Sequence, residues 1–586
     1  MTRDFKYVNG VGRLSRRSAL LAAATVSLAA LVTGLSPLRS AESPSPAAEP
    51  GMKIGVSTHF GQNWPLDMLT SARSVEATFF RDTISWDNVE VSKGAYVFNR
   101  PNTVYPEALD DFGARTTLTF NWGNAFYDNG DTPYSEEARR AQARFIESTL
   151  ARYKNVDVIE IGNEFNGNNF VTGPIREQSG AERAESYVRM LAPIAEGVRS
   201  ARPDVKILGG ATHSIPVGYI EQLIEAGAMD YMDGLAIHPY TTPPEQLERQ
   251  VAYLRSRLPD PAMPIFATEF GSTNENFAAD YMVKMYSVMS AAGIEHAIWY
   301  PLRRQGNSTS VPLVANNGAV TSAGEAYAFI QRDLSDARFR DVSPDPFTYA
   351  FQAGRSTVVL WGEPRSFSVR NPQIAVYSAE GDRIAPPASL DMDTVLILVS
   401  ESGIDLANDI ELGPNRLVAD SYHQFEYVDR PGKENAFERY FLVNGERRPA
   451  EIMGGGERSG TIWTPYFGNP YLRPARIAAD GMIPAVFDPG TESQKTVSIV
   501  HSYVADRDMS LNVRSEWVTS DRTDDGVTVR ICLNDRTLDE QLVMGTAQIG
   551  LKTIDVNKGD RLDFILSPNA NSEGDGTSYR IRLFEN

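Results

Sequence analysis

Two glutamates stand just after short apolar runs of the sequence. The run 158–161 precedes Asn163 and Glu164, and the run 264–268 precedes Glu269, 105 residues after Glu164. Parallel strands of a barrel present such side chains together, at the rim formed by their carboxyl ends. Two carboxyls placed there can work as a pair, because one can protonate a leaving oxygen while the other attacks a sugar carbon or activates water. That is the chemistry of glycosidic bond hydrolysis.

The neighbours of the two glutamates favour a catalytic interpretation. The Asn163 amide can donate to a sugar 2-hydroxyl while Glu164 reaches the glycosidic oxygen, so one strand end meets two parts of a transition state. Gly271 lets the chain turn sharply away after Glu269. The alternative is that Glu164 is structural and that Glu269 only places a negative charge at the N-terminus of the next helix.

Further polar side chains follow other predicted strands. Arg81 could keep a neighbouring carboxyl ionised through its fixed positive charge, and its alternative role is a surface ion pair. Tyr240 could donate a hydrogen bond to the same carboxylate, or it could cap the core. Three more residues complete the expected substrate-binding rim: His59, Asn121 and His238.

Three tryptophans come just after predicted strands. Trp86, Trp122 and Trp299 could each stack an indole on the face of a sugar ring. A tryptophan can equally belong to the core. Trp299 has the stronger claim to a binding role, because it ends the last predicted strand.

No motif of the sequence implies a metal or a nucleotide cofactor. There is no HExxH, no paired Cys/His spacing and no GxGxxG after a strand, so we expect no cofactor. The clusters 524–526 and 571–575 carry oxygen ligands that suit Ca²⁺ but are also typical of turns. A net charge of −19 argues against nucleic acid and anionic membranes as partners, and it allows a neutral sugar.

The residues from 51 to 336 alternate short apolar runs with amphipathic stretches. This alternation is typical of βα units, and eight units in about 285 residues predict an α/β fold, the (β/α)₈ or TIM barrel. The predicted strands are 53–56, 77–80, 116–120, 158–161, 206–209, 234–237, 264–268 and 296–298, and the clearest predicted helices begin near 65, 135, 184, 277 and 322.

The chain is too long for a single core, and its sequence pattern changes after the predicted barrel. Runs of β-forming residues with turns between them predict a small accessory antiparallel β domain over 337–404. Similar runs over 405–586 predict a β-sandwich, which we interpret as a possible carbohydrate-binding module.

Residues 1–50 have the composition of an export signal and linker. Arg16 and Arg17 precede an apolar run over 19–32 and a stretch rich in Ser, Pro and Ala, which resembles a twin-arginine signal. The alternative is an N-terminal membrane anchor, but the run is short for a span. We therefore expect a periplasmic or extracellular mature protein without an integral membrane span. The one cysteine, Cys532, allows no intramolecular disulfide.

The motifs over 53–335 resemble those of clan A glycoside hydrolases. In the clan's order stand Arg81, Asn163-Glu164, His238-Pro-Tyr240, Thr268-Glu269-Phe-Gly271 and Trp299. The stretches 81–86 and 93–98 look most like glycoside hydrolase family 39, and the predicted small β domain is similar to that family's accessory domain.

The resemblance implies a retaining β-glycosidase, with Glu164 as acid/base, Glu269 as nucleophile and Asn163 on the 2-hydroxyl. We expect the substrate to be a polysaccharide, such as a bacterial exopolysaccharide or a plant wall glycan, and the action to be endo. A transglycosylase with the same residues and an inactive polysaccharide-binding protein remain alternatives. Beside an ionised Glu269 we expect Glu164 to titrate high and activity to be bell-shaped with pH.

Overall fold

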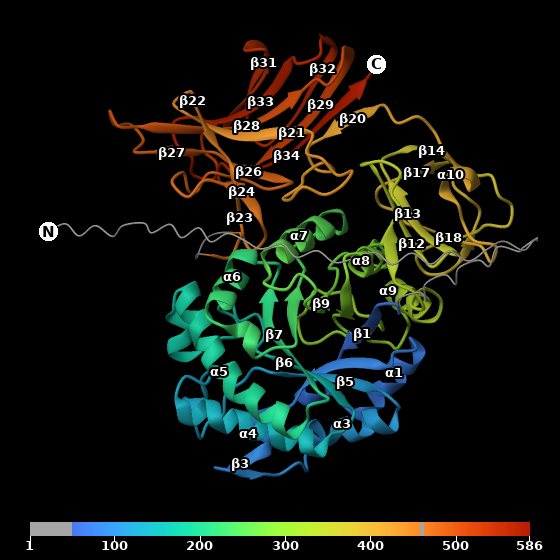
Figure 1. Cartoon of the computed structure of the whole chain (residues 1–586), viewed down its shortest axis with the longest axis vertical. Helices are drawn as coiled ribbons and strands as arrows, with labels where there is room; N and C mark the ends of the chain where they lie inside the picture. Colours follow the sequence, from blue (N-terminus) through green and yellow to red (C-terminus); the bar gives the residue numbers. More distant parts are fainter. Residues whose placement is uncertain (1–49, 458–461) are drawn as a thin grey trace, which may run out of the picture. The chain divides into compact units, whose positions relative to one another are not determined.

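A computed structural model describes residues 50–457 and 462–586 of the chain. All but Pro50 of the predicted signal and linker therefore lies outside the described residues. Eight parallel strands close a barrel in the order β1-β10-β9-β8-β7-β6-β5-β2, and the helices surround it (Figure 1). The barrel strands are β1 (Lys53–Ser57), β2 (Phe79–Thr83), β5 (Arg115–Phe120), β6 (Val156–Ile161), β7 (Lys206–His213), β8 (Gly234–His238), β9 (Ile265–Phe270) and β10 (Ile294–Trp299).

Helices with one apolar face cover the outside of the barrel. Side-chain caps fix the starts of three of them: Ser135, Ser179 and Thr321 each accept a hydrogen bond from a backbone N–H of the first turn. The helices are α1 (Leu69–Ser74), α2 (Trp86–Val89), α3 (Pro101–Asp111), α4 (Glu136–Arg152), α5 (Gly180–Ala201), α6 (Val217–Glu225), α7 (Pro244–Arg257), α8 (Ala278–Ala291) and α9 (Ser322–Phe329). The short strands β3 (Glu90–Ser92) and β4 (Ala95–Tyr96) pair beyond α2.

The predicted fold class is confirmed, because the closed parallel barrel is followed by antiparallel sheets. Strand β2 extends further than expected and takes in Arg81 and Asp82, which the sequence analysis placed after its end. Both side chains are buried. Their charges therefore belong to the barrel interior and need partners there.

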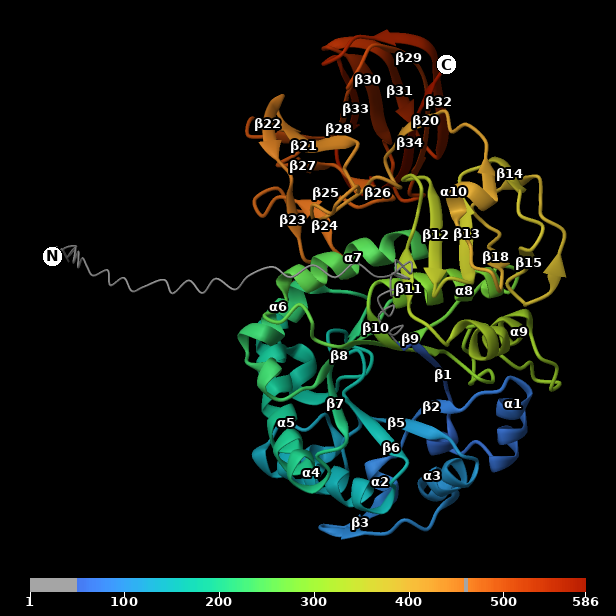
Figure 2. The same ribbon diagram turned by 45° about the vertical axis from the view of Figure 1, so that its right-hand side comes forward.

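Two small sheets follow the barrel (Figure 2). One has the order β11-β12-β13-β18-β15-β16 and the other β17-β14-β19. Their strands are β11 (Phe339–Asp341), β12 (Thr348–Ala353), β13 (Thr357–Gly362), β14 (Arg365–Val369), β15 (Ala375–Tyr377), β16 (Arg383–Ile384), β17 (Ser389–Leu390), β18 (Leu396–Val399) and β19 (Ile410–Leu412), with the helix α10 (Leu406–Asp409).

Two larger antiparallel sheets form the last part of the chain. Burial alternates along β29, so one face of its sheet packs inward and the other meets solvent. The first sheet contains β20 (Leu417–Asp420), β23 (Glu451–Met453), β24 (Tyr466–Gly468), β25 (Arg476–Ile477), β26 (Gly481–Ile483), β29 (Met509–Thr519), β32 (Thr546–Val556) and β34 (Thr577–Glu585). The second contains β21 (Phe437–Val443), β22 (Glu446–Pro449), β27 (Ala485–Phe487), β28 (Lys495–Val504), β30 (Val527–Leu533), β31 (Arg536–Val543) and β33 (Arg561–Pro568).

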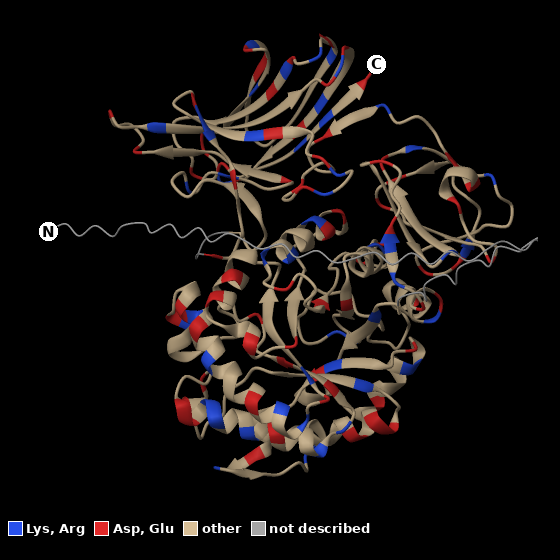
Figure 3. Cartoon of the chain, viewed as in Figure 1, with Lys and Arg blue, Asp and Glu red and all other residues tan. Residues whose placement is uncertain are grey.

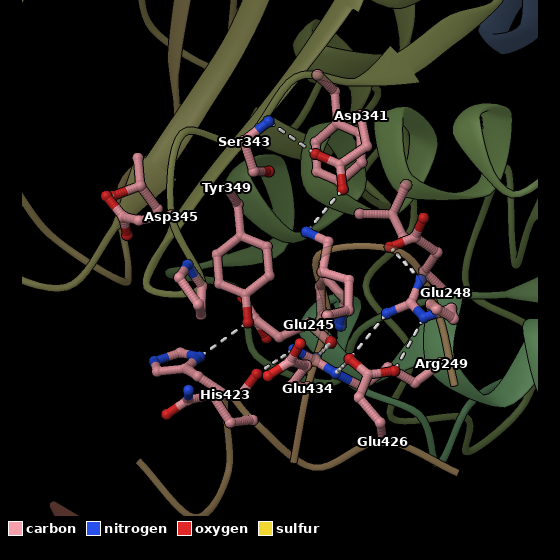
Figure 4. A pocket seen from close by; sticks show the side chains of 18 residues that line it. Glu245, Glu248, Arg249, Asp341, Ser343, Asp345, Tyr349, His423, Glu426 and Glu434 are labelled. Atoms are coloured by element: carbon pink, nitrogen blue, oxygen red, sulfur yellow. Dashed lines mark hydrogen bonds and ion pairs between the residues drawn. The ribbon is translucent and has the colours of Figure 1, made fainter. Parts of the chain in front are cut away.

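A polar junction joins helix α7 to the segments that follow the barrel (Figure 4). The Arg249 guanidinium donates to Glu426 at 2.9 Å, and both side chains are buried. The Tyr349 hydroxyl lies 2.8 Å from His423 Nδ1. Since two buried charges satisfy each other here, the junction holds these segments against α7.

Charged residues of both signs are interspersed over the barrel helices (Figure 3). Among the described residues, no helix combines the length and the apolar character needed to cross a membrane.

Candidate active site

The carboxyl ends of the barrel strands bring Glu164 and Glu269 together. One oxygen of each lies within 4.8 Å of the other, with a ring nitrogen of His238 in the same group. Glu164 follows β6 after a turn in which Gly162 has φ 86° and Glu164 itself has φ 45°. A left-handed conformation is strained for glutamate, and such strain is found where a side chain must be aimed.

Glu269 is held by two donors. An Arg81 guanidinium nitrogen pairs with Glu269 Oε1, and the Tyr240 hydroxyl donates to Oε2 at 2.9 Å. Arg81 also donates to Asn163 Oδ1 at 2.9 Å, so it fixes the amide beside the acid/base candidate. A carboxylate with a guanidinium on one oxygen and a hydroxyl on the other is fixed in orientation.

Glu160 lies beneath this pair and was missed in the sequence. Its side chain is fully buried and accepts from Arg81 Nε at 2.6 Å. The hydroxyls of Thr119 and Thr268 donate to it at 2.8 and 2.6 Å. Burial raises the pKa of Glu160, but the charge of Arg81 and the other donors outweigh it and hold the pKa far below its usual range. Glu160 is therefore a buried anion that fixes Arg81.

His238 contacts the carboxyls through both ring nitrogens. The Thr268 hydroxyl donates its hydrogen bond to Glu160, so the hydroxyl oxygen accepts a hydrogen bond from His238 Nε2 at 3.1 Å. The other nitrogen, Nδ1, lies 3.3 Å from Glu164 Oε1 and 3.9 Å from Glu269 Oε2. An unprotonated nitrogen facing an unprotonated carboxylate would be repelled, so Nδ1 and Oε1 share one proton.

In the free site this shared proton resides on the histidine. Burial lowers the pKa of His238, but the charge of Glu269 and the hydrogen bonds to Glu160 and Glu164 raise it to about 9. Burial raises the pKa of Glu164, but the hydrogen bonds from His213 and His238 lower it to about 2. The expectation that Glu164 titrates high is thus wrong for the free site, because it counted the neighbouring carboxylate and omitted two histidines.

His213 is the second histidine on Glu164 and was also missed. Its Nδ1 lies 3.2 Å from Glu164 Oε1. The register of β7 against β8 shifts between Gly209 and Thr212, where Gly210 and Ala211 have φ of 85° and 42°. Such a bulge turns the following side chains, which directs His213 at the carboxyl.

A cleft of about 150 Å³ opens on the Glu269 side. Trp122 is 45% exposed there, so its indole offers a face to a ligand. Asn121 accepts from the backbone N–H of Asn163 at 2.9 Å and thereby sets the amide's position. Burial, followed by the charge of Arg81, lowers the pKa of His59 to about 4, so this histidine is neutral. Within 50–457 and 462–586 its Nε2 has no hydrogen-bond partner.

Two predicted binding residues are corrected by their burial. Trp86 is 1% exposed, stacks between Tyr127 and Phe145 and donates to Glu90. Trp299 is 0% exposed and donates to the Val311 carbonyl at 2.9 Å. Since neither indole has a free face, both are core residues. The structure brings together the other nine: Arg81, His59, Asn121, Trp122, Asn163, Glu164, His238, Tyr240 and Glu269.

Two groups of side chains place metal-type ligand atoms close together. They are Glu164, His238 and Glu269 at the site, and Glu363, Asp420 and His423 beyond the barrel. Each group already contains a bound guanidinium, from Arg81 in the first and Arg580 in the second. A cation would have to compete with an arginine in both. The 524–526 and 571–575 clusters are turns in which Asp525 accepts from two backbone N–H groups.

Comparison with known proteins adds a family match. Residues 151–327 match the family described as "Glycosyl hydrolase catalytic core", in agreement with the resemblance noted in the sequence. No curated protein matches the chain.

The chain is also similar to several solved structures. A family 39 glycoside hydrolase from Bacteroides cellulosilyticus WH2 is 18% identical, with a TM-score of 0.49 over 60% of this chain and 81% of that one. A GH39 β-xylosidase from Caulobacter crescentus is 14% identical, with a TM-score of 0.45 over 60% and 98%. The GH39 enzyme from Xanthomonas axonopodis pv. citri is 11% identical, with a TM-score of 0.41 over 89% and 96%.

Proposed function

We propose that this chain, a glycoside hydrolase whose barrel carries the glycosyl hydrolase catalytic core, cleaves β-glycosidic bonds of a polysaccharide by double displacement. The observation that carries the proposal is the separation of Glu164 and Glu269, whose closest oxygens lie within 4.8 Å. Retaining enzymes place their carboxyls roughly 5–5.5 Å apart, and inverting enzymes leave roughly 6.5–9.5 Å for a water. The distance supports the retaining chemistry.

In the first step Glu269 attacks the anomeric carbon. A bond forms from its carboxylate oxygen to that carbon, and the bond to the glycosidic oxygen breaks. The departing oxygen keeps the electron pair and takes a proton from Glu164. Arg81 and Tyr240 hold Glu269 in one orientation for the attack.

The proton for the leaving oxygen comes from the pair formed by His238 and Glu164. The two atoms are 3.3 Å apart, so the proton can pass from Nδ1 to the carboxyl when the glycosidic oxygen approaches. In the second step Glu164, again a carboxylate, takes a proton from water. The water oxygen bonds to the anomeric carbon, and Glu269 leaves as a carboxylate.

The finer parts of the proposal concern substrate, action and location. A second, larger cavity is lined by Glu164 and not by Glu269, which supports a leaving group as large as a sugar and therefore endo-action on a polymer. Arg16 and Arg17 support export to the periplasm or beyond. The same cavity favours one second candidate function, transglycosylation, in which a sugar hydroxyl replaces the water.

Intact-protein mass spectrometry after incubation with 2,4-dinitrophenyl 2-deoxy-2-fluoro-β-glycosides of glucose, xylose, mannose and galactose tests the proposal. We expect a mass gain of one sugar with at least one of them. The adduct should vanish in Glu269→Gln and persist in Glu164→Gln, because this leaving group needs no acid. If wild-type protein gains no sugar from the panel, or if the adduct maps to another residue, the double displacement on Glu269 is refuted.

A further inference from the structure

We propose that the described residues between β23 and β24, which are 454–457 and 462–465 and are called the β23–β24 segment below, contribute Glu457 and Trp463 to a site for the leaving-group sugar. The inference rests on the proposed function and deepens it. It gives the β-sheets after residue 405 a direct part in recognising the substrate next to Glu164. It predicts that a neutral sugar with free hydroxyls binds there.

The first observation is a cavity of about 890 Å³ that borders Glu164. Its size falls in the range of roughly 300–1,000 Å³ that small-molecule sites occupy. The barrel supplies part of the lining, including His213 and Tyr219, and the β23–β24 segment supplies Glu457 and Trp463. A leaving group that Glu164 protonates is therefore expected to depart into a cavity lined by two regions of the chain.

The second observation is the position of Trp463. Its half-buried ring meets His213 edge to face, with the ring centroids 6.3 Å apart. His213 in turn contacts Glu164. Only His213 separates the Trp463 indole from Glu164 in this chain of contacts. The indole is therefore placed to pack on the ring of the leaving sugar, whose glycosidic oxygen accepts the proton from Glu164.

The third observation is how closely the segment lies against helix α6. The Gly218 N–H donates to the Gly455 carbonyl at 3.0 Å, and Gln222 donates to the Glu457 carbonyl at 3.2 Å. A Cβ on Gly454 would come within 2.3 Å of the Gly218 nitrogen, and one on Gly456 within 2.6 Å of Pro216. These glycines allow the approach, so the contact is a built feature of the sequence.

The fourth observation concerns unpartnered polar atoms at the cavity wall. The hydroxyl of Tyr219, a residue 1% exposed, and Glu457 Oε2 are both buried and have no hydrogen-bond partner among the described residues. The other oxygen of Glu457 accepts from Tyr466 at 2.8 Å and Arg473 at 3.0 Å, so the side chain is fixed. A carboxylate oxygen needs a donor and a phenol can supply or accept a proton, which is what sugar hydroxyls satisfy.

Reactivation of the trapped glycosyl-enzyme measures this site directly. The 2-fluoroglycosyl enzyme is freed of excess reagent and incubated with buffer alone or with cellobiose, xylobiose or mannobiose as acceptor. Water releases the sugar slowly, and an acceptor bound beside Glu164 accelerates release by transglycosylation. We expect at least one disaccharide to accelerate release from the wild-type protein.

Three variants locate the effect. Trp463→Ala should lower the ratio of acceptor-assisted release to release by water about tenfold, in line with the loss of an aromatic contact. Tyr219→Phe removes only an unpartnered hydroxyl, so it keeps the fold and should lower the acceleration several-fold. Tyr471→Ala is the matched control, since Tyr471 is an aromatic residue of the same region that is 91% exposed and does not line the cavity.

The outcomes separate the two proposals. An adduct whose release is accelerated equally in wild type, Trp463→Ala and Tyr219→Phe, or by no acceptor at all, overturns the inference and leaves the retaining mechanism intact. Loss of acceleration in Tyr471→Ala as well would also overturn it, because the effect would not be local to the cavity. Absence of any adduct removes the proposed function and the inference with it.

Discussion

Replacing Glu160 by glutamine tests whether the buried anion under the site organises it. Glutamine keeps the shape of the side chain but removes its charge, so Arg81 loses its charged partner at 2.6 Å and keeps Glu269 and the Asn163 amide oxygen. Breaking a buried ion pair costs roughly 3–5 kcal/mol. Because one partner remains, we expect a loss of about 3 kcal/mol, or roughly 6 °C in the melting temperature of the barrel.

The same substitution should change the pH dependence of catalysis. Glu160 is one of the groups that raise the pKa of His238 to about 9. A raised pKa keeps the shared proton bound below that pH, so wild-type kcat/KM should fall as the pH rises through about 9. In Glu160→Gln this alkaline limb should move to lower pH.

The assay combines calorimetry with kcat/KM against pH for an alkyl glycoside identified by the trapping experiment. Glu185→Gln is the control, since Glu185 is an exposed carboxylate on α5 that pairs with Arg189 in an exposed ion pair. A Glu160→Gln protein that melts within about 1 °C of the control and keeps the wild-type alkaline limb would refute the role assigned to Glu160.

Three further predictions concern the acid, the acid sensitivity and the tryptophans. Glu164→Gln should slow hydrolysis of an alkyl glycoside by about 10²–10⁴-fold and leave a dinitrophenyl glycoside little changed in the glycosylation step, as initial-rate kinetics would register. The pKa of Glu164 in the fold is about 2, below the ordinary 4.5, so its stabilisation is present above pH 4.5 and is lost as the pH falls. Between pH 5 and pH 3 the unfolding free energy measured with urea should therefore fall by roughly 2 kcal/mol more in the wild type than in Glu164→Gln. An equal fall in both proteins would contradict the low pKa. Trp299→Phe should lower the melting temperature with KM unchanged, and Trp122→Ala should raise KM with stability changed by less than about 0.5 kcal/mol; the reverse pattern in the two variants would restore Trp299 as a binding residue.

The fold and the two carboxyls could be predicted because each depends on local pattern. An apolar run that ends on a polar residue indicates both a parallel strand and the position of its carboxyl end. From this pattern Glu164 and Glu269 were predicted to lie together at the barrel rim, as they do. Trp86 and Trp299 were misplaced for the same reason. Position after a strand indicates where the backbone ends and does not indicate whether an indole turns inward, as both do here.

The residues that escaped prediction act through contacts between distant strands. Glu160 was counted within an apolar run, although a lone charge in a buried strand requires an opposite charge, and Arg81 was available. His213 depends on a bulge in β7 whose indication, two glycines in succession at 209 and 210, is weak. Trp463 is nearly 300 residues from Glu164, and no local pattern links the two.

The polar junction at α7 has a consequence for how this chain can be inherited. The described residues form one compact unit, and among them Glu426 supplies the carboxylate that pairs with Arg249. A gene fragment ending after α9 would encode a barrel whose outer helix carries an orphaned guanidinium and an uncovered wall. Recombination that shuffles catalytic barrels among unrelated β modules should therefore spare this chain, and its parts should descend together.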